Sequence, residues 1–144
     1  MFSRIVVAVD GSEQSNHALA TACDIAQKYS SELHLVHSPQ LDTVALAVGS
    51  GAFNVQPSQK AINDAGKHVM DSAIELAKLQ GCTPKSTAIG NDDPAREVLK
   101  QVEKTDADLI VTGRRGLGGI SSMLLGSVSG KISQEAGCAC LTVK

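Results

Sequence analysis

Aromatic residues are scarce in this sequence of 144 residues, which contains no tryptophan, one tyrosine and two phenylalanines. Proteins that hold single-stranded nucleic acid commonly stack its bases on aromatic side chains. A surface that attracts nucleic acid also needs clustered positive charge, whereas the formal net charge here is −2. We therefore expect no nucleic-acid partner.

Long hydrophobic runs are missing as well. No apolar stretch approaches the roughly 18 residues that a membrane-spanning helix needs, so we expect no membrane insertion. The chain enters an apolar strand pattern at residue 4, without the charged and hydrophobic regions of a secretory signal. These absences favour a cytoplasmic protein.

Closely spaced cysteines are rare, since Cys23 and Cys82 stand alone and only Cys138 and Cys140 lie near each other. The Cys-Ala-Cys spacing is neither the redox CxxC motif nor half of a zinc site. We expect all four thiols to be small apolar packing groups in a reducing compartment.

Hydrophobic residues (42%) and charged residues (19%) occur in the proportions of an ordinary globular protein. The length favours a single domain over residues 1–144. Apolar runs predict five strands, and helical periodicity predicts four helices between them. The strands are expected at 4–9, 32–37, 85–89, 109–112 and 140–143, and the helices at 13–29, 57–80, 94–105 and 127–135. This alternation indicates a parallel sheet with helices on both faces.

The segment 39–56 joins a predicted strand to a predicted helix and is harder to interpret. It contains Gly-Ser-Gly, yet several of its residues are too apolar for a solvated linker. Because long loops in compact domains are usually functional, we expect a flap that folds over a ligand or a partner.

Residues with special chemistry follow the ends of the predicted strands. In chain order they are Asp10, His37, Ser38, Gly90 and Gly113. Parallel sheets bind ligands beyond the carboxyl ends of their strands, where the strand order reverses. The binding site is therefore expected at this edge, with His37 as a hydrogen-bonding residue at a strand end rather than a catalyst.

The stretch 109–132 runs from a buried strand through a glycine-rich loop to a predicted helix start. Its glycines at 113, 116, 118, 119 and 126 are expected to adopt positive φ and to let the backbone approach a ligand. The helix start near Ser127 offers unpaired N–H groups and the positive end of a helix dipole. Together these features predict an anion site, and phosphate is the usual anion.

Two common phosphate signatures are excluded. In the P-loop pattern, the glycine position upstream of Gly130-Lys131 holds Leu125, and Ile132 takes the place of serine or threonine. The dinucleotide fingerprint would follow the first strand as GxGxxG, whereas the chain reads DGSEQS there. Gly130 and Lys131 are therefore expected inside a helix and outside the phosphate site.

The glycines of this stretch have the spacing G-2x-G-9x-G-[ST], formed by Gly113, Gly116 and Gly126-Ser127. Together with IVVAVDGSEQSNHALATACDIA, LHLVHS and IGNDDPAREVLK, this motif resembles the nucleotide-binding branch of the universal stress protein family over the whole chain. The resemblance implies a Rossmann-like (adenine nucleotide alpha hydrolase-like) three-layer α/β fold with five parallel strands in the order 3-2-1-4-5. It also implies that ATP binds at the switch between the first and fourth strands.

The family's site residues can be carried over by position. Asp10 is expected to contact adenine through its backbone and ribose through its carboxylate, with Ala8 and Val9 beside it. Ser38 and Thr112 are expected to make the base pocket polar. The residues implied to lie along the ribose and phosphates are Gly113, Arg114, Gly116, Gly126, Ser127, Val128 and Ser129.

Two further properties follow from the resemblance. Mg²⁺ or Mn²⁺ would bridge the phosphates, since hard cations prefer oxygen ligands. Two copies of the chain would pair edge to edge through the last strand, 140–143, which covers an apolar ribbon that otherwise promotes aggregation. The resemblance leaves a downstream protein partner unidentified.

Several of these residues have plain structural alternatives. Asp10 can serve as the N-cap of the first helix, and Ser127 or Ser129 can cap the last one. Arg114 and Arg115 can be solvated instead of touching phosphate.

Three functions remain open at this point. Phosphoryl transfer needs a group that orients the attacking oxygen, and the segment 113–129 contains no Glu, Asp or Gln. This favours a regulatory ATP-binding protein over an ATPase or phosphotransferase, although Asp92 or Asp93 can approach from the third strand. Slow hydrolysis or autophosphorylation is compatible with that preference. An interaction module without a ligand is the third candidate, and the glycine motif argues against it.

Overall fold

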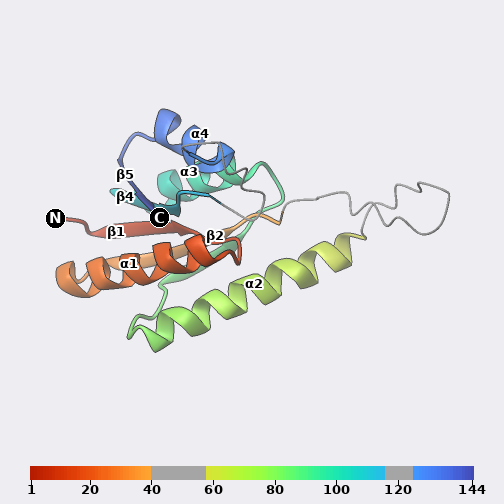
Figure 1. Cartoon of the computed structure of the whole chain (residues 1–144), viewed down its shortest axis with the longest axis horizontal. Helices are drawn as coiled ribbons and strands as arrows, with labels where there is room; N and C mark the ends of the chain where they lie inside the picture. Colours follow the sequence, from red (N-terminus) through yellow and green to blue (C-terminus); the bar gives the residue numbers. More distant parts are fainter. Residues whose placement is uncertain (40–57, 116–124) are drawn as a thin grey trace.

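Strands and helices alternate along the chain as expected (Figure 1). The computed structural model describes residues 1–39, 58–115 and 125–144. The strands are β1 (Arg4–Ala8), β2 (Glu32–His37), β3 (Ser86–Ile89), β4 (Leu109–Gly113) and β5 (Ala139–Val143). The helices are α1 (Glu13–Tyr29), α2 (Gln59–Leu79), α3 (Pro94–Thr105) and α4 (Ser127–Glu135). Apart from Pro39, the flap expected at 39–56 lies outside the described residues.

All five strands form one parallel sheet in the order β3-β2-β1-β4-β5, which confirms the predicted fold class. The chain first adds strands on one side of β1 and then crosses to the other side. In the centre of the sheet, Val7 therefore lies opposite Leu35 of β2 and Val111 of β4. The strand order reverses between β1 and β4, and sheets of this kind bind ligands at such a switch point.

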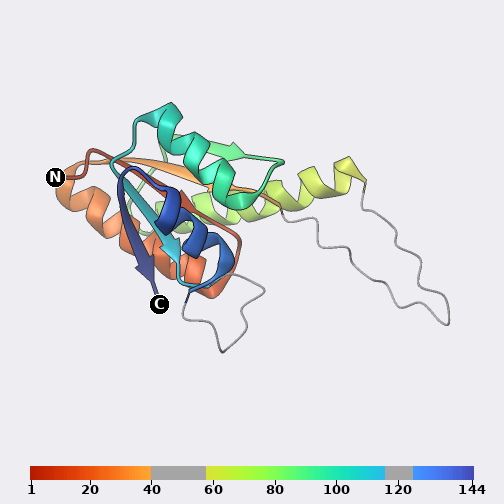
Figure 2. The same ribbon diagram turned by 90° about the horizontal axis from the view of Figure 1, so that it is seen from above.

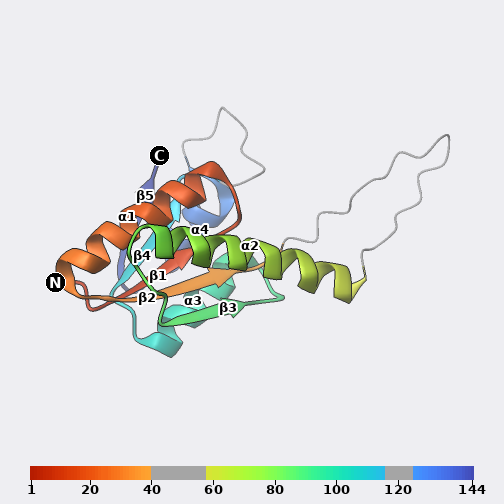
Figure 3. The same cartoon turned by 90° about the horizontal axis from the view of Figure 1, so that it is seen from below.

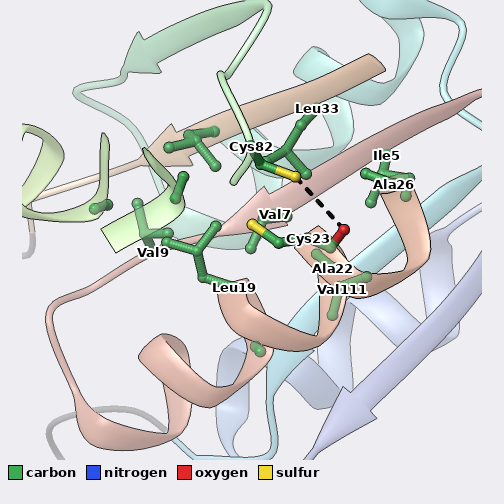
Figure 4. Close-up of a cluster of buried hydrophobic side chains, with 14 of the residues drawn as sticks. Ile5, Val7, Val9, Leu19, Ala22, Cys23, Ala26, Leu33, Cys82 and Val111 are labelled. Atoms are coloured by element: carbon green, nitrogen blue, oxygen red, sulfur yellow. Dashed lines mark hydrogen bonds between the residues drawn. The ribbon is translucent and has the colours of Figure 1, made fainter. Parts of the chain in front are cut away.

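The two faces of the sheet are covered by different helices. α1 and α2 lie on one face (Figure 3), and α3 and α4 lie on the other (Figure 2). Because successive strand residues point to opposite faces, Ile5 and Val7 pack under α1 while Val6 packs under α3. The larger cluster, on the α1 side, is drawn in Figure 4 and includes Leu19, Cys23, Leu33, Leu35, Met70 and Val111.

Side chains cap three of the four helices that the structure describes. Ser12 caps α1, Ser58 caps α2, and Asp93 caps α3 as the sequence predicted. α4 follows Gly126 and has no side-chain cap among the described residues. The N–H groups of its first turn are therefore not satisfied by a capping side chain.

The cysteines differ in their surroundings. Cys23 and Cys82 are buried, as expected for packing residues, and Cys138 is half-buried. Cys140 is exposed on β5, so the packing role expected for it is wrong. All four are free thiols.

Candidate functional site

The carboxyl ends of β1, β2 and β4 bring the sequence-predicted residues to the same end of the sheet. Val9 and Asp10 continue β1, Ser38 follows β2, and Arg114 follows β4. The backbone N–H of Gly126 donates to the carbonyl of Arg114 at 2.8 Å, so α4 begins directly beside the end of β4. Parts of the chain that are distant in sequence thus meet at the β1–β4 switch point.

Asp10 organises the turn between β1 and α1. Its Oδ1 accepts the N–H of Ser12 at 2.9 Å, and its own N–H donates to Ser15 Oγ at 3.1 Å. The N-cap of α1 is Ser12, whose hydroxyl accepts the N–H of Ser15, so the capping alternative for Asp10 is wrong. Because the N–H of Asp10 is engaged, a backbone contact with a base has to use its carbonyl. Oδ2 is the carboxylate oxygen left for a ligand.

Val9 and His37 fix the neighbouring strand ends. Val9 is buried, and its N–H donates to the carbonyl of Val36 at 2.9 Å. Its carbonyl accepts from Nδ1 of His37 at 2.7 Å, so Nδ1 carries a proton. This supports the structural role expected for His37. Ala8, at the end of β1, is half-buried against the smaller core cluster.

The two hydroxyls expected in the base pocket have different surroundings. Ser38 is buried, and its Oγ donates to the backbone carbonyl of Asp92, which ties β2 to the loop before α3. Its polarity is therefore used within the protein. Thr112 is also buried, and its Oγ1 has no hydrogen-bond partner among the described residues. An unpaired buried hydroxyl costs free energy, so a ligand or water that accepts from Thr112 would stabilise this end of β4.

Gly113 is required by packing rather than by backbone conformation. A Cβ at this position would lie 2.9 Å from the carbonyl carbon and 3.0 Å from the Cβ of Gln14 on α1. The expectation of positive φ at Gly113 and Gly126 is wrong, because the described glycines with positive φ are Gly11 and Gly81. β4 and α1 approach closely because Gly113 has no side chain.

Arg114 connects three elements through its backbone. Its N–H donates to the carbonyl of Val143 on β5 at 2.7 Å. Its carbonyl accepts both the N–H of Gly126 at 2.8 Å and the hydroxyl of Ser129 at 3.0 Å. A Cβ on Gly126 would lie only 3.2 Å from that carbonyl oxygen, so a glycine suits this close approach. The strand end and the helix start are thereby held together.

The three residues in the first turn of α4 differ in their exposure to solvent. Ser127 is exposed, Val128 is half-buried, and Ser129 is buried. The single hydroxyl proton of Ser129 is directed at the carbonyls of Arg114 and Gly126. The expected hydroxyl contact between Ser129 and phosphate therefore competes with these bonds, whereas no side chain of the described residues caps the N–H groups of the turn. Gly116, predicted to line the phosphates, lies outside the described residues.

Gly130 and Lys131 lie inside α4, as the excluded P-loop pattern predicted. The ammonium of Lys131 lies 3.2 Å from Asp93 Oδ1, at the start of α3. This lysine therefore joins two helices.

Asp92 and Asp93, the acidic residues considered as catalysts, both form ion pairs with lysines. Oδ2 of Asp92 pairs with Lys100 at 3.3 Å, and Oδ1 of Asp93 caps α3 and pairs with Lys131. The N–H of Asp93, and next Lys100, lower the pKa of Asp92. The N–H of Arg96, with a smaller contribution from Lys131, lowers the pKa of Asp93. Carboxylates with lowered pKa values are weak bases, so neither is poised to activate a nucleophile.

The sequence interpretation missed three contributors to this site. Ser12 and Ser15 build the Asp10 turn, and Ser12 carried a usable signal because it directly precedes a helical pattern. The contact between Gly113 and Gln14 had no such signal, since it depends on tertiary packing.

Two further properties concern the described residues as a whole. No helix in 1–39, 58–115 or 125–144 has the length and apolar character that a bilayer span requires. The same residues contain no group of three or more His, Cys, Asp or Glu side chains arranged to hold a metal ion.

Comparison with known proteins assigns the family. The profile of the universal stress protein family matches residues 1–144. Universal stress protein YxiE of Bacillus subtilis is 32% identical over 149 residues, which cover 100% of both chains. A universal stress protein from Archaeoglobus fulgidus in complex with dAMP is 22% identical, with a TM-score of 0.71 over 99% of this chain and 98% of that one. A family protein from Arabidopsis thaliana with AMP bound is 20% identical, with a TM-score of 0.65 over 99% and 91%. The chain belongs to the universal stress protein family.

Proposed function

We propose that this protein binds an adenine nucleotide at the β1–β4 switch point, that the ligand is ATP, and that nucleotide occupancy regulates its role in the stress response. The observation that carries the proposal is the start of α4. It has no side-chain cap among the described residues and is held beside the end of β4 by Arg114. Two structures with the same fold contain dAMP and AMP, which supports an adenine nucleotide as the ligand class.

In this proposal the turn after β1 holds the nucleoside. The carbonyl of Asp10 meets the base and its Oδ2 accepts a ribose hydroxyl, while Ala8 and Val9 lie beside it. Ser38 and Thr112 border the base, and Thr112 supplies the hydroxyl that has no described partner.

The phosphates lie against the start of α4. The N–H groups of Ser127, Val128 and Ser129 donate to phosphate oxygens there, and the positive end of the helix dipole adds to the attraction. Gly113, Gly116 and Gly126 let the backbone approach the phosphates, and Arg114 lies within reach. Mg²⁺ or Mn²⁺ would take most of its ligands from phosphate oxygens and water, because the described residues offer no metal-binding cluster.

A regulatory binding protein fits better than an enzyme. Asp92 and Asp93 are committed to Lys100, Lys131 and the α3 cap. Hydrolysis at about 1 per second or faster, lost in Asp92→Ala, would contradict this part of the proposal. We also propose a homodimer through β5, which forms an edge of the sheet and whose residues Leu141–Val143 are half-buried in one copy.

The decisive experiment compares two variants at one position. Ser127→Pro removes an N–H from the first helical position of α4, where proline is well tolerated. Gly126 already has φ −67° and ψ 159°, the extended conformation that a following proline requires. Ser127→Ala, the matched control, removes only the hydroxyl. A hydrogen bond to a charged phosphate contributes about 1.5–3 kcal/mol, so Ser127→Pro should lose roughly 10- to 100-fold in ATP affinity by calorimetry.

The ligand itself is identified by denaturing freshly purified protein and separating the released nucleotides by chromatography. ATP with Mg²⁺ should also raise the melting temperature more than AMP does, because bound ligand stabilises the folded state. If no nucleotide is released and neither ATP nor AMP raises the melting temperature, the ligand-free interaction module is the correct function. Release of AMP alone would support the nucleotide site and would identify AMP, rather than ATP, as the ligand.

A further inference from the structure

Two cysteines that are distant in sequence meet on the α1–α2 face of the sheet, away from the proposed nucleotide site. Cys23 lies on α1 and is fully buried, while Cys82 lies between α2 and β3 and is 9% exposed. The thiol of Cys82 donates to the backbone carbonyl of Cys23, with Sγ and O 3.5 Å apart. Figure 4 shows the two side chains next to each other, with their sulfur atoms on facing sides.

Gln27 lies over this pair, one turn after Cys23 on α1. Its Nε2 donates to the carbonyl of Gln80 and lies 3.7 Å from the Sγ of Cys82. The turn below it is fixed by Gly81, which has φ +77° and whose added Cβ would lie 3.3 Å from Gln27 Nε2. Gln27 itself is exposed. Its flexible side chain therefore lies beside Cys82 at the protein surface.

We propose that Cys23 and Cys82 form an intramolecular disulfide when the protein meets a peroxide, and that the Gln27 side chain limits the access of peroxide to Cys82. The pair is suited to this because one thiol lies at the rim of the core and the other directly behind it. Each thiol has its partner in place before oxidation. The modification requires no other cysteine.

The chemistry takes two steps that balance. The Cys82 thiolate attacks one oxygen of hydrogen peroxide, the O–O bond breaks, and the second oxygen leaves as hydroxide, which takes up the proton that the Cys82 thiol released and becomes water. Cys82 is then a sulfenic acid. Cys23 next loses its proton and attacks the Cys82 sulfur as a thiolate, the S–O bond breaks, and the departing hydroxide takes up that proton to form a second water. Two electrons pass from the two sulfurs to the peroxide.

The order of the steps follows from burial. Burial and the neighbouring Cys82 thiol raise the pKa of Cys23 to about 12, so this residue is a poor first nucleophile. Cys82 at the rim reacts with peroxide first, and Cys23 resolves the sulfenic acid. The reaction should be slow near neutral pH and faster at higher pH, because both steps need a thiolate.

The bond would close a loop that contains β2 and α2. A cross-link of this kind restricts the unfolded chain and therefore raises stability. The oxidised protein is expected to melt at a higher temperature than the reduced protein. Reduction with dithiothreitol should reverse the shift.

The experiment uses the full chain carrying Cys138→Ser and Cys140→Ser, so that the two remaining thiols are Cys23 and Cys82. After treatment with hydrogen peroxide, the intact mass should fall by about 2 Da, the two hydrogens lost on disulfide formation. Peptide mapping without reductant should join the peptides that contain Cys23 and Cys82. Gln27→Ala should form the bond several-fold faster, while Gln80→Ala, which retains its backbone carbonyl, should react at the rate of the parent.

Each outcome decides the proposal. A mass gain from sulfinic or sulfonic acid without the loss of hydrogen would overturn it, because the two sulfurs would then be out of reach of each other. An unchanged mass after prolonged exposure would overturn it equally. Equal rates in Gln27→Ala and the parent would remove the gating role of Gln27. Mapping of the wild-type chain gives an independent answer should the double variant fold poorly.

Discussion

The hydroxyl of Ser129 donates to the carbonyl oxygen of Arg114 at 3.0 Å, which joins the first turn of α4 to the end of β4. Ser129→Ala leaves that half-buried carbonyl with one donor, the N–H of Gly126. We expect a loss of about 1 kcal/mol in the free energy of unfolding, measured with urea. Ser127→Ala is the control and should stay within about 0.5 kcal/mol of the wild type, because Ser127 is exposed. Equal stability of the two variants would show that the Ser129 bond contributes nothing in solution.

Gly113→Ala should destabilise the protein whether or not nucleotide is present. Its Cβ would lie 2.9–3.0 Å from atoms of Gln14, so β4 and α1 would have to move apart. Overpacking of this kind costs about 1–3 kcal/mol, which chemical denaturation measures directly. Gly137→Ala has no atom within 4 Å of the added Cβ and serves as the control. If Gly113→Ala is fully stable yet loses ATP, the glycine is there for the ligand and not for α1.

Lys131→Met tests whether Lys131 binds phosphate in the way a P-loop lysine does. Because the Lys131 ammonium pairs with Asp93 across α3 and α4, ATP affinity should stay within about twofold of the wild type. A lysine that held phosphate would instead lose about tenfold or more on removal of its charge. Isothermal titration with ATP and Mg²⁺ separates these results. Asp93→Ala, by contrast, should cost about 1 kcal/mol of stability through the lost helix cap.

His34 should make stability depend on pH near neutrality. It lies buried on β2 with Nδ1 2.7 Å from Ser86 Oγ, and burial lowers its pKa while the nearby Glu32 partly opposes the shift and Arg4 and Lys85 add to it. In the unfolded chain its pKa is about 6.5, so the unfolded state binds more protons below that pH. Stability is therefore complete above about pH 6.5 and falls as the pH drops toward the lowered folded-state pKa.

The measurement is the free energy of unfolding between pH 7.5 and 5. His34→Gln, which can still bond Ser86, should show a smaller loss than the wild type over this range. His68→Gln, at an exposed position of α2, should follow the wild type. Parallel curves for wild type and His34→Gln would show that His34 titrates normally in the folded protein.

Local signals explain why the elements were predictable from the sequence. Asp93-Pro94 starts α3 as expected, because the cap and the fixed φ of proline act within one turn. The bounds of α4 were also predicted, as was the parallel sheet with its strand order. Continuous apolar strands between amphipathic helices leave few other arrangements.

The internal use of polar groups was not predictable in the same way. The hydroxyls of Ser38 and Ser129 donate to carbonyls of Asp92 and Arg114, which only the folded chain brings near. The close approach of Gly113 to Gln14 is likewise a tertiary contact. Glycine and serine patterns therefore predict where a site lies, whereas the atoms left for a ligand depend on the fold.

The bond between the Gly126 N–H and the Arg114 carbonyl has a consequence for how such a site can diversify. Both partners are backbone groups, so the side chain at position 114 can change while α4 still starts at the end of β4. The frame of this end of the sheet is thereby separable from the chemistry of its side chains.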